Sequence, residues 1–169
     1  MVRSMKPTLT QAPPHPRTLG YLGRALSLEL SAVQQYLTQG TLADAWGLTE
    51  AAARFRAETV EELRHAERIV QHMLSLGVAP NASALRPAAV ARSLRDLLLQ
   101  DARLESEIVG LYAQASDFCQ RIGDQESGAL FESLLADEVH HAREIDDWLA
   151  ELEGPQQPRW PAGELRATF

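Results

Sequence analysis

Cysteine is almost absent from this chain of 169 residues, and acidic side chains outnumber basic ones. The one cysteine, Cys119, cannot form an internal disulfide bond, and it excludes metal sites built from cysteine pairs, such as rubredoxin-like or zinc-ribbon sites. The 16 lysines and arginines against 23 aspartates and glutamates give a net charge of −7. This charge opposes binding to nucleic acid or anionic lipid and favours cations. We therefore expect no nucleic-acid partner, no membrane partner, and a metal ion as the ligand.

The first seventeen residues lack an apolar run and contain four prolines. Neither a signal peptide nor a membrane segment fits this composition, so we expect a cytoplasmic protein. Residues 1–17 are predicted to form a flexible, proline-rich tail, and residues 155–169, which hold three prolines, to form a second one. Residues 18–154 are predicted to form a single domain, which is long enough to bury a large core.

The segment 18–154 has apolar residues at helical spacing, few glycines and prolines, and no alternating strand pattern. This pattern predicts an all-α fold. Four helices are expected, at about 19–44, 49–77, 93–121 and 125–154. Thr49 is predicted to cap the start of the second helix and Ser93, with Asp96 three residues later, the start of the third. Gly77 is a suitable residue to end the second helix.

The connections between the helices predict the topology. Short turns join the first helix to the second and the third to the fourth, so each pair should form an antiparallel hairpin. Residues 77–92 are different, because sixteen extended residues span about 50 Å at roughly 3.3 Å each. That is enough to run the length of a bundle of such helices. We therefore predict an antiparallel four-helix bundle with a long crossover between the second and third helices.

Each predicted helix carries an acid on its core-facing stripe, and two helices add a histidine: Glu29, Glu62, His65, Glu105, Glu138 and His141. Buried carboxylates are unfavourable when unpaired, and four together also repel one another. Two divalent cations would balance the four charges, with two neutral imidazoles as further ligands. This donor set suits iron or manganese better than calcium or structural zinc.

The spacing of these residues repeats. The separation between Glu29 and Glu62 is the same as that between Glu105 and Glu138, so one constant offset relates the first pair to the second. We call this the repeat offset. The second acid of each pair begins a Glu-x-x-His motif, whose spacing directs both side chains inward. One such motif is common on solvated helix faces, but two at matching positions favour a metal site over a structural polar core.

Four other polar residues are predicted to act around the site or away from it. Glu58 and Asp101 lie one turn from ligand positions, and are expected either to orient the ligands or to sit at wet ends of the bundle. His72 is predicted to be a hydrogen-bonded core or rim histidine, or to assist iron transit. His140 should point away from the core.

The chain resembles the bacterioferritin branch of the ferritin-like diiron-carboxylate superfamily over about residues 19–152. Five segments carry the resemblance: ELSAVQQY at 29–36, WGL at 46–48, ELRHAE at 62–67, APN at 79–81 and DEVHH at 137–141. The resemblance implies a ferritin-like bundle with two iron ions per subunit. It implies terminal ligands at Glu29 and Glu105, bridging carboxylates at Glu62 and Glu138, and one nitrogen ligand for each iron from His65 and His141. Tyr36 matches a tyrosine that lies beside the site.

The resemblance also implies a function. The expected activity is that of a ferroxidase, which oxidises Fe(II) to Fe(III) with O₂ or H₂O₂ for iron storage and detoxification. The alternatives are a diiron oxidase or oxygenase acting on a small organic substrate, and a non-catalytic subunit of a mixed ferritin shell. A homo-oligomer is expected, at least a dimer, with a 24-subunit shell possible. Haem-binding members place a methionine where this chain has Leu63, so we expect no haem.

Overall fold

The computed structural model describes residues 13–82 and 84–153. They form four helices: α1 (Pro16–Ala45), α2 (Thr49–Ser75), α3 (Leu94–Ile122) and α4 (Gln125–Glu153). No strand occurs in these two segments, so the predicted all-α fold is confirmed. Most of the two predicted tails lies outside the described residues, and those tails stay a prediction. None of the four helices is long and apolar enough to cross a membrane.

Two helix starts differ from the prediction. α1 begins at Pro16, inside the predicted tail, because Pro16 suits the first helical position and the His15 ring nitrogen accepts a hydrogen bond from the Arg17 backbone. The sequence predicts Thr49 as the cap of α2, but Thr49 is the first helical residue, and Leu48 takes the cap position without a side-chain hydrogen bond. Ser93 caps α3 as predicted, accepting from the Asp96 backbone at 3.1 Å.

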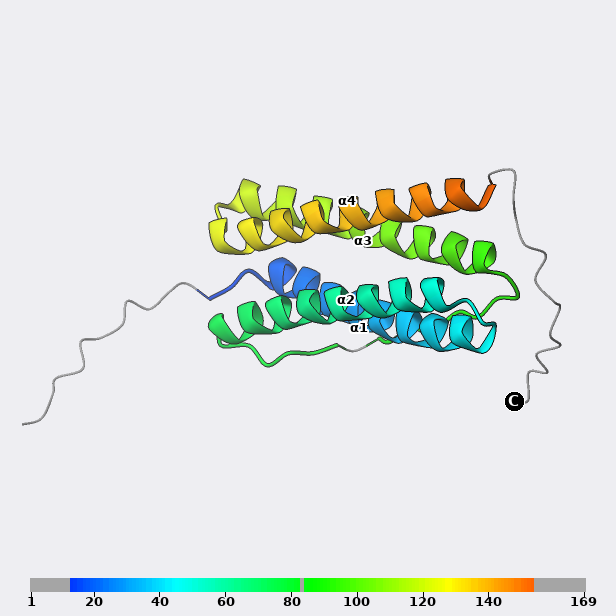
Figure 1. Cartoon of the computed structure of the whole chain (residues 1–169). Coiled ribbons are helices and arrows are strands. Elements are labelled where there is room, and N and C mark those ends of the chain that lie inside the picture. Colours follow the sequence, from blue (N-terminus) through cyan, green and yellow to red (C-terminus); the bar gives the residue numbers. More distant parts are fainter. Residues whose placement is uncertain (1–12, 83, 154–169) are drawn as a thin grey trace, which may run out of the picture.

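The helices form two hairpins, α1 with α2 and α3 with α4, that pack against each other (Figure 1). Gly77 follows α2 and Gly123 follows α3, both with positive φ near 75°, which favours glycine. α1 packs along α3, whereas α2 and α4 pack together more sparsely. The metal-ligand candidates of α2 and α4 lie along this sparse seam.

The predicted crossover is confirmed: the chain between α2 and α3 runs the length of the bundle beside α1 (Figure 1). Its backbone is fixed to α1 by two side chains. Arg86 N donates to Ser31 Oγ at 3.1 Å, and Ala89 N donates to Gln35 Oε1 at 3.0 Å. Because the crossover runs in the direction of α1, α3 starts where α1 ends and the two helices are antiparallel. This arrangement brings the middles of all four helices to one level.

Candidate metal centre

The six predicted ligand residues meet in the middle of the bundle. Each helix contributes one fully buried acid: Glu29 on α1, Glu62 on α2, Glu105 on α3 and Glu138 on α4. The histidines are also buried, with His65 4% and His141 8% exposed. Ligand atoms of four residues from α2 and α4 lie within 4.8 Å of one another: Glu62, His65, Glu138 and His141. Such a group can hold a metal ion.

The acids of α2 and α4 lie between the two histidines. His65 Nδ1 is 3.2 Å from Glu62 Oε2 and 2.8 Å from Glu138 Oε1. His141 Nδ1 is 3.4 Å from Glu62 Oε1 and 3.6 Å from Glu138 Oε2. Each of these glutamates therefore turns one oxygen towards each histidine. The acid of α1 joins the group, with Glu29 Oε2 3.8 Å from His65 Nδ1.

Two tyrosines hold the remaining acids. Tyr36 of α1 donates a hydrogen bond to Glu105 of α3, and Tyr112 of α3 donates one to Glu29 of α1. Both phenols are buried. The sequence indicated Tyr36 but not Tyr112, which looked like one more core aromatic. The repeat contained the missing signal, because the repeat offset that relates Glu29 to Glu105 also relates Tyr36 to Tyr112.

Burial and mutual repulsion determine the charges of the metal-free centre. Burial raises the pKa of Glu29 and Glu105 well above the usual range, and the carboxylates of Glu62 and Glu138 raise it further. Both shifts favour the protonated, neutral form of these two acids. Burial opposes ionisation of Glu62 as well, but the neighbouring imidazoles of His141 and His65 outweigh it and lower its pKa to about 2.

The histidines carry the compensating charge. Burial alone would lower the pKa of an imidazole, but the adjacent carboxylates of Glu138 and Glu62 raise the pKa of His65 to about 9 and that of His141 to about 11. The pKa of Glu138 is lowered, because the two histidines outweigh its burial. Two imidazolium ions therefore lie against the carboxylates of Glu62 and Glu138.

Hydrogen bonding leaves this core incomplete. One buried oxygen on each of the α1 and α3 acids, Glu29 Oε2 and Glu105 Oε2, makes no hydrogen bond within the described residues, and neither does Glu62 Oε1. Buried acceptors are almost always paired, so these oxygens require a partner that the polypeptide does not supply. Carboxylate oxygens and imidazole nitrogens converging on one space fit divalent iron or manganese. The donor set therefore fits a metal site.

The other polar residues lie around the centre or away from it. Glu58 Oε2 is 3.9 Å from His141 Nδ1, close enough to act on a candidate ligand. Asp101 is fully buried, so it does not sit at a wet end of the bundle, and it accepts hydrogen bonds from Gln35 and Gln39. His72 bonds to Ser127 at the opposite end. His140 is exposed, as expected.

The comparisons with known proteins agree with this architecture. A family model described as the ferritin-like domain matches residues 19–154. The bacterioferritin of Rhodobacter capsulatus is 34% identical over 142 residues, which cover 83% of this chain and 88% of that protein. The bacterioferritin of Brucella melitensis is 31% identical over 153 residues, which cover 90% and 94%.

A solved structure of Rhodobacter capsulatus bacterioferritin has the same fold. It matches with a TM-score of 0.81 and 32% identity, and covers 85% of this chain and 91% of that one. That structure is described as having a metal-free dinuclear site and a haem iron in a crystallographic special position. The present chain belongs to the ferritin-like family, within its bacterioferritin branch.

Proposed function

We propose that this chain is a bacterioferritin-type ferroxidase, which binds two Fe(II) ions as substrate and oxidises them with O₂ or H₂O₂ for iron storage and detoxification. The convergence of four buried acids and two histidines at one level of the bundle carries this proposal. The proposed ligands are the six residues of the candidate centre. Bound iron would supply the electrons that reduce the oxidant.

The roles of the acids follow from their positions. Glu62 and Glu138 each direct one oxygen to each histidine, which supports a bridging role. Glu29 and Glu105 are each held from outside by a tyrosine hydroxyl, which supports a terminal role. Those hydrogen bonds favour the ionised carboxylate, the form that binds a metal, and so help these buried acids to lose their protons.

Charge balance would be kept by exchanging protons for metal. With the acids of α1 and α3 in the protonated form that their raised pKa values favour, metal binding would remove four protons, one from each of these acids and one from each histidine. Two divalent ions bring four positive charges. Loss of the four protons would therefore leave the buried core neutral in both states, which avoids a large desolvation penalty.

Anaerobic titration of the metal-free full chain with Fe(II), followed by exposure to air, tests the proposal. We expect saturation at about two irons per chain and rapid formation of Fe(III), seen as near-ultraviolet absorbance. Glu138→Gln removes a bridging carboxylate and should abolish the rapid phase, whereas the exposed Glu132→Gln on the same helix should not. A chain that binds no Fe(II), or binds it without oxidation in air, contradicts the proposal.

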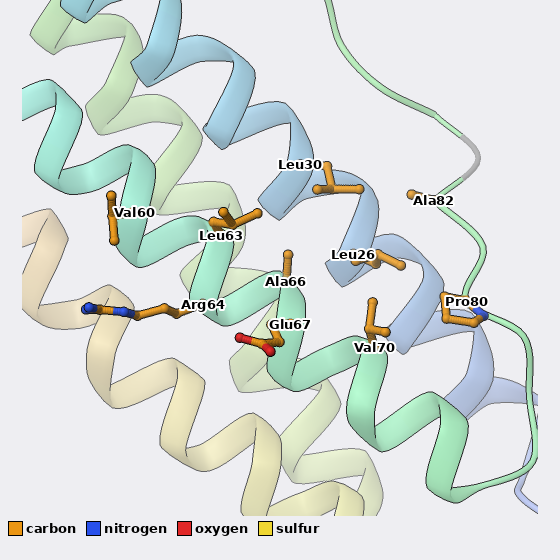
Figure 2. Close-up of a pocket in the computed structure, with 10 residues that line it drawn as sticks. All are labelled: Leu26, Leu30, Val60, Leu63, Arg64, Ala66, Glu67, Val70, Pro80 and Ala82. Carbon is orange, nitrogen blue, oxygen red and sulfur yellow. The ribbon is translucent and has the colours of Figure 1, made fainter.

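The outer face of the α1 and α2 hairpin holds the residues on which our proposals about haem binding and oligomerisation rest. Leu63 lines an apolar groove of about 680 Å³ together with Leu26 and Leu30 of α1 and Pro80 of the crossover (Figure 2). Leu63 is half exposed, and so is Leu37, two turns after Leu30 on α1. We propose that a second copy of the chain covers this face, and that no haem is ligated there, because a leucine cannot bind iron.

Two measurements on the purified chain test these points. Light scattering should give at least a dimer, with Leu63→Glu shifting the mass towards one chain. A full shell would appear as about twenty-four chains. Reconstitution with haemin should produce no axially ligated haem spectrum, and a monomeric wild type or a ligated haem would contradict this part of the proposal.

A further inference from the structure

Arg68 of α2 makes a two-pronged contact with α4 beside the metal centre. Its Nη1 donates to Asp137 Oδ2 at 2.8 Å, and its Nη2 donates to Ser133 Oγ at 2.7 Å. A guanidinium suits this task because its planar group presents several donors in fixed directions. Arg68 thus joins two helices that otherwise pack sparsely.

The same aspartate also faces a proposed ligand. Asp137 Oδ2, the oxygen that accepts from Arg68, is 3.7 Å from Nε2 of His65. The other ring nitrogen, Nδ1, faces inward to the carboxylates of the centre. This distance is that of an ion-pair contact and is longer than a hydrogen bond. A carboxylate at the outer nitrogen of a metal-binding histidine orients the ring. Arg68 in turn fixes the carboxylate.

Among the described residues, no such bridge supports the other histidine, His141. The repeat offset relates Arg68 to Glu144, Asp137 to Glu61 and Ser133 to Ala57. Two acids and an alanine cannot form the same bridge. The two acids instead have partners on their own helices, with Glu144 3.5 Å from His140 and Glu61 paired with Arg64. The side chain that faces His141 from outside the ligand set is Glu58, 3.9 Å away.

We propose that Arg68 is a positioning residue of the metal centre: through Asp137 it holds His65 in its inward orientation, so that the metal position at His65 binds more tightly than the one at His141. This inference rests on the proposed function, because it takes both histidines as ligands. A preorganised ligand loses less conformational freedom on binding. Outer partners of metal ligands typically contribute about 10- to 100-fold to affinity, and we expect the lower end for this partly exposed pair.

Calorimetric titration of the metal-free full chain with Co(II), with visible absorption recorded in parallel, tests the inference. The wild type should bind two Co(II) ions, the first about tenfold more tightly than the second. Arg68→Gln should weaken the first step about tenfold, alter the absorption of the first ion bound, and leave the second step unchanged. Arg64→Gln, one turn earlier on α2 and equal in charge change, should leave both steps unchanged.

Further variants separate positioning from mere attachment of the helices. Asp137→Asn should reproduce the loss, and the double variant with Arg68→Gln should lose no more than either single variant, because both act along one path. Arg68→Lys should recover only part of the affinity. Equal weakening of both steps together with a lower melting temperature of the metal-free chain would overturn the inference.

The outcomes also distinguish the inference from the function on which it rests. A wild-type chain that binds no Co(II) and no Fe(II) overturns the proposed function and this inference with it. Two Co(II) ions bound normally, with Arg68→Gln indistinguishable from wild type, overturns the role of Arg68 alone. Two steps of equal affinity in the wild type would do the same.

Discussion

The two halves of the bundle are alike around the candidate metal centre but differ at two polar positions one turn from it. We call the four buried acids, Glu29, Glu62, Glu105 and Glu138, the ring. The repeat offset is kept in the ring and among aromatic residues near it, as in Tyr36 with Tyr112 and Phe55 with Phe131. The repeat is lost at two positions one turn from the ligands: Asp101 corresponds to Ala25, and Glu58 corresponds to Leu134. A pair of cations requires similar donors on both sides, but nothing requires the surroundings to match. The outer residues are therefore where the two proposed metal positions would acquire different properties.

The surroundings of Asp101 illustrate this difference. Asp101 is completely buried, and one of its oxygens accepts hydrogen bonds from Gln35 and Gln39 at 2.9 and 2.8 Å. Its other oxygen makes no hydrogen bond within the described residues. At the corresponding position of the other end, Ala25 and Leu134 pack in an apolar core. The burial of Asp101 outside the metal centre therefore has no counterpart at the matching position of the other half.

The largest predicted effect concerns the symmetric ring and is a dependence of metal binding on pH. The pKa values of both histidines are raised, to about 9 and about 11, and so are those of Glu29 and Glu105, so protons compete with the metal for all four groups, and for the histidines above neutral pH as well. Affinity should therefore fall as pH falls, by up to about a hundredfold per ion for each pH unit, if four protons leave for two ions. Calorimetry of Co(II) binding in buffers of different ionisation enthalpy measures the protons released.

Two variants sharpen this test of symmetry. Glu29→Gln and Glu105→Gln each replace a protonated acid by a neutral amide, so each should release about three protons for two ions in place of four. Weaker binding is expected in both, to a similar extent. A large difference between the two variants would show that the ring itself is asymmetric, and that the two halves are not alike at the buried acids.

The next effect concerns Asp101, which has no acidic counterpart in the other half, and is a dependence of stability on pH. Burial raises the pKa of Asp101 from 3.8 to about 7, although the two glutamine hydrogen bonds oppose this shift. The unfolded chain ionises this acid first, so its contribution to stability is lost as pH rises from about 4 to about 7. The loss is about 1.4 kcal/mol per pH unit within that window, or about 3 kcal/mol between pH 4.5 and pH 7.

Asp101→Asn should remove this contribution while keeping an oxygen that accepts from the two glutamines. The unfolding free energy of the variant, relative to wild type, should therefore increase by about 3 kcal/mol between pH 4.5 and pH 7, as measured by urea denaturation of the metal-free chain. Asp146→Asn on the surface of α4 is the matched control. A constant difference at all pH values would mean that Asp101 is ionised throughout this range in the folded chain.

The sequence predicted the fold and most of the site because both depend on periodic signals. Helical spacing, the turn glycines and the length of the crossover predicted the bundle, and the repeated Glu-x-x-His motif predicted where the six proposed ligands meet. Tyr112 was missed because an aromatic residue on a core stripe is usually packing. The contact between Arg68 and Asp137 could not be predicted, because these residues lie on different helices at partly exposed positions and no periodicity links them.

The smallest predicted effect concerns the two tyrosines that donate hydrogen bonds to acids of the ring, and it is a loss of metal affinity. Tyr36→Phe and Tyr112→Phe each remove a hydroxyl that donates to a carboxylate, Glu105 or Glu29. Because that hydrogen bond favours the ionised acid, each variant should bind Co(II) more weakly by about 1 kcal/mol, or roughly fivefold. Tyr21→Phe, which removes a hydroxyl that bonds to Arg17 far from the centre, should leave the affinity unchanged. Equal losses in the two variants are required if the two halves match at the ring. A loss in only one variant would show that the halves already differ among the buried acids and their tyrosines, and not only at the residues around them.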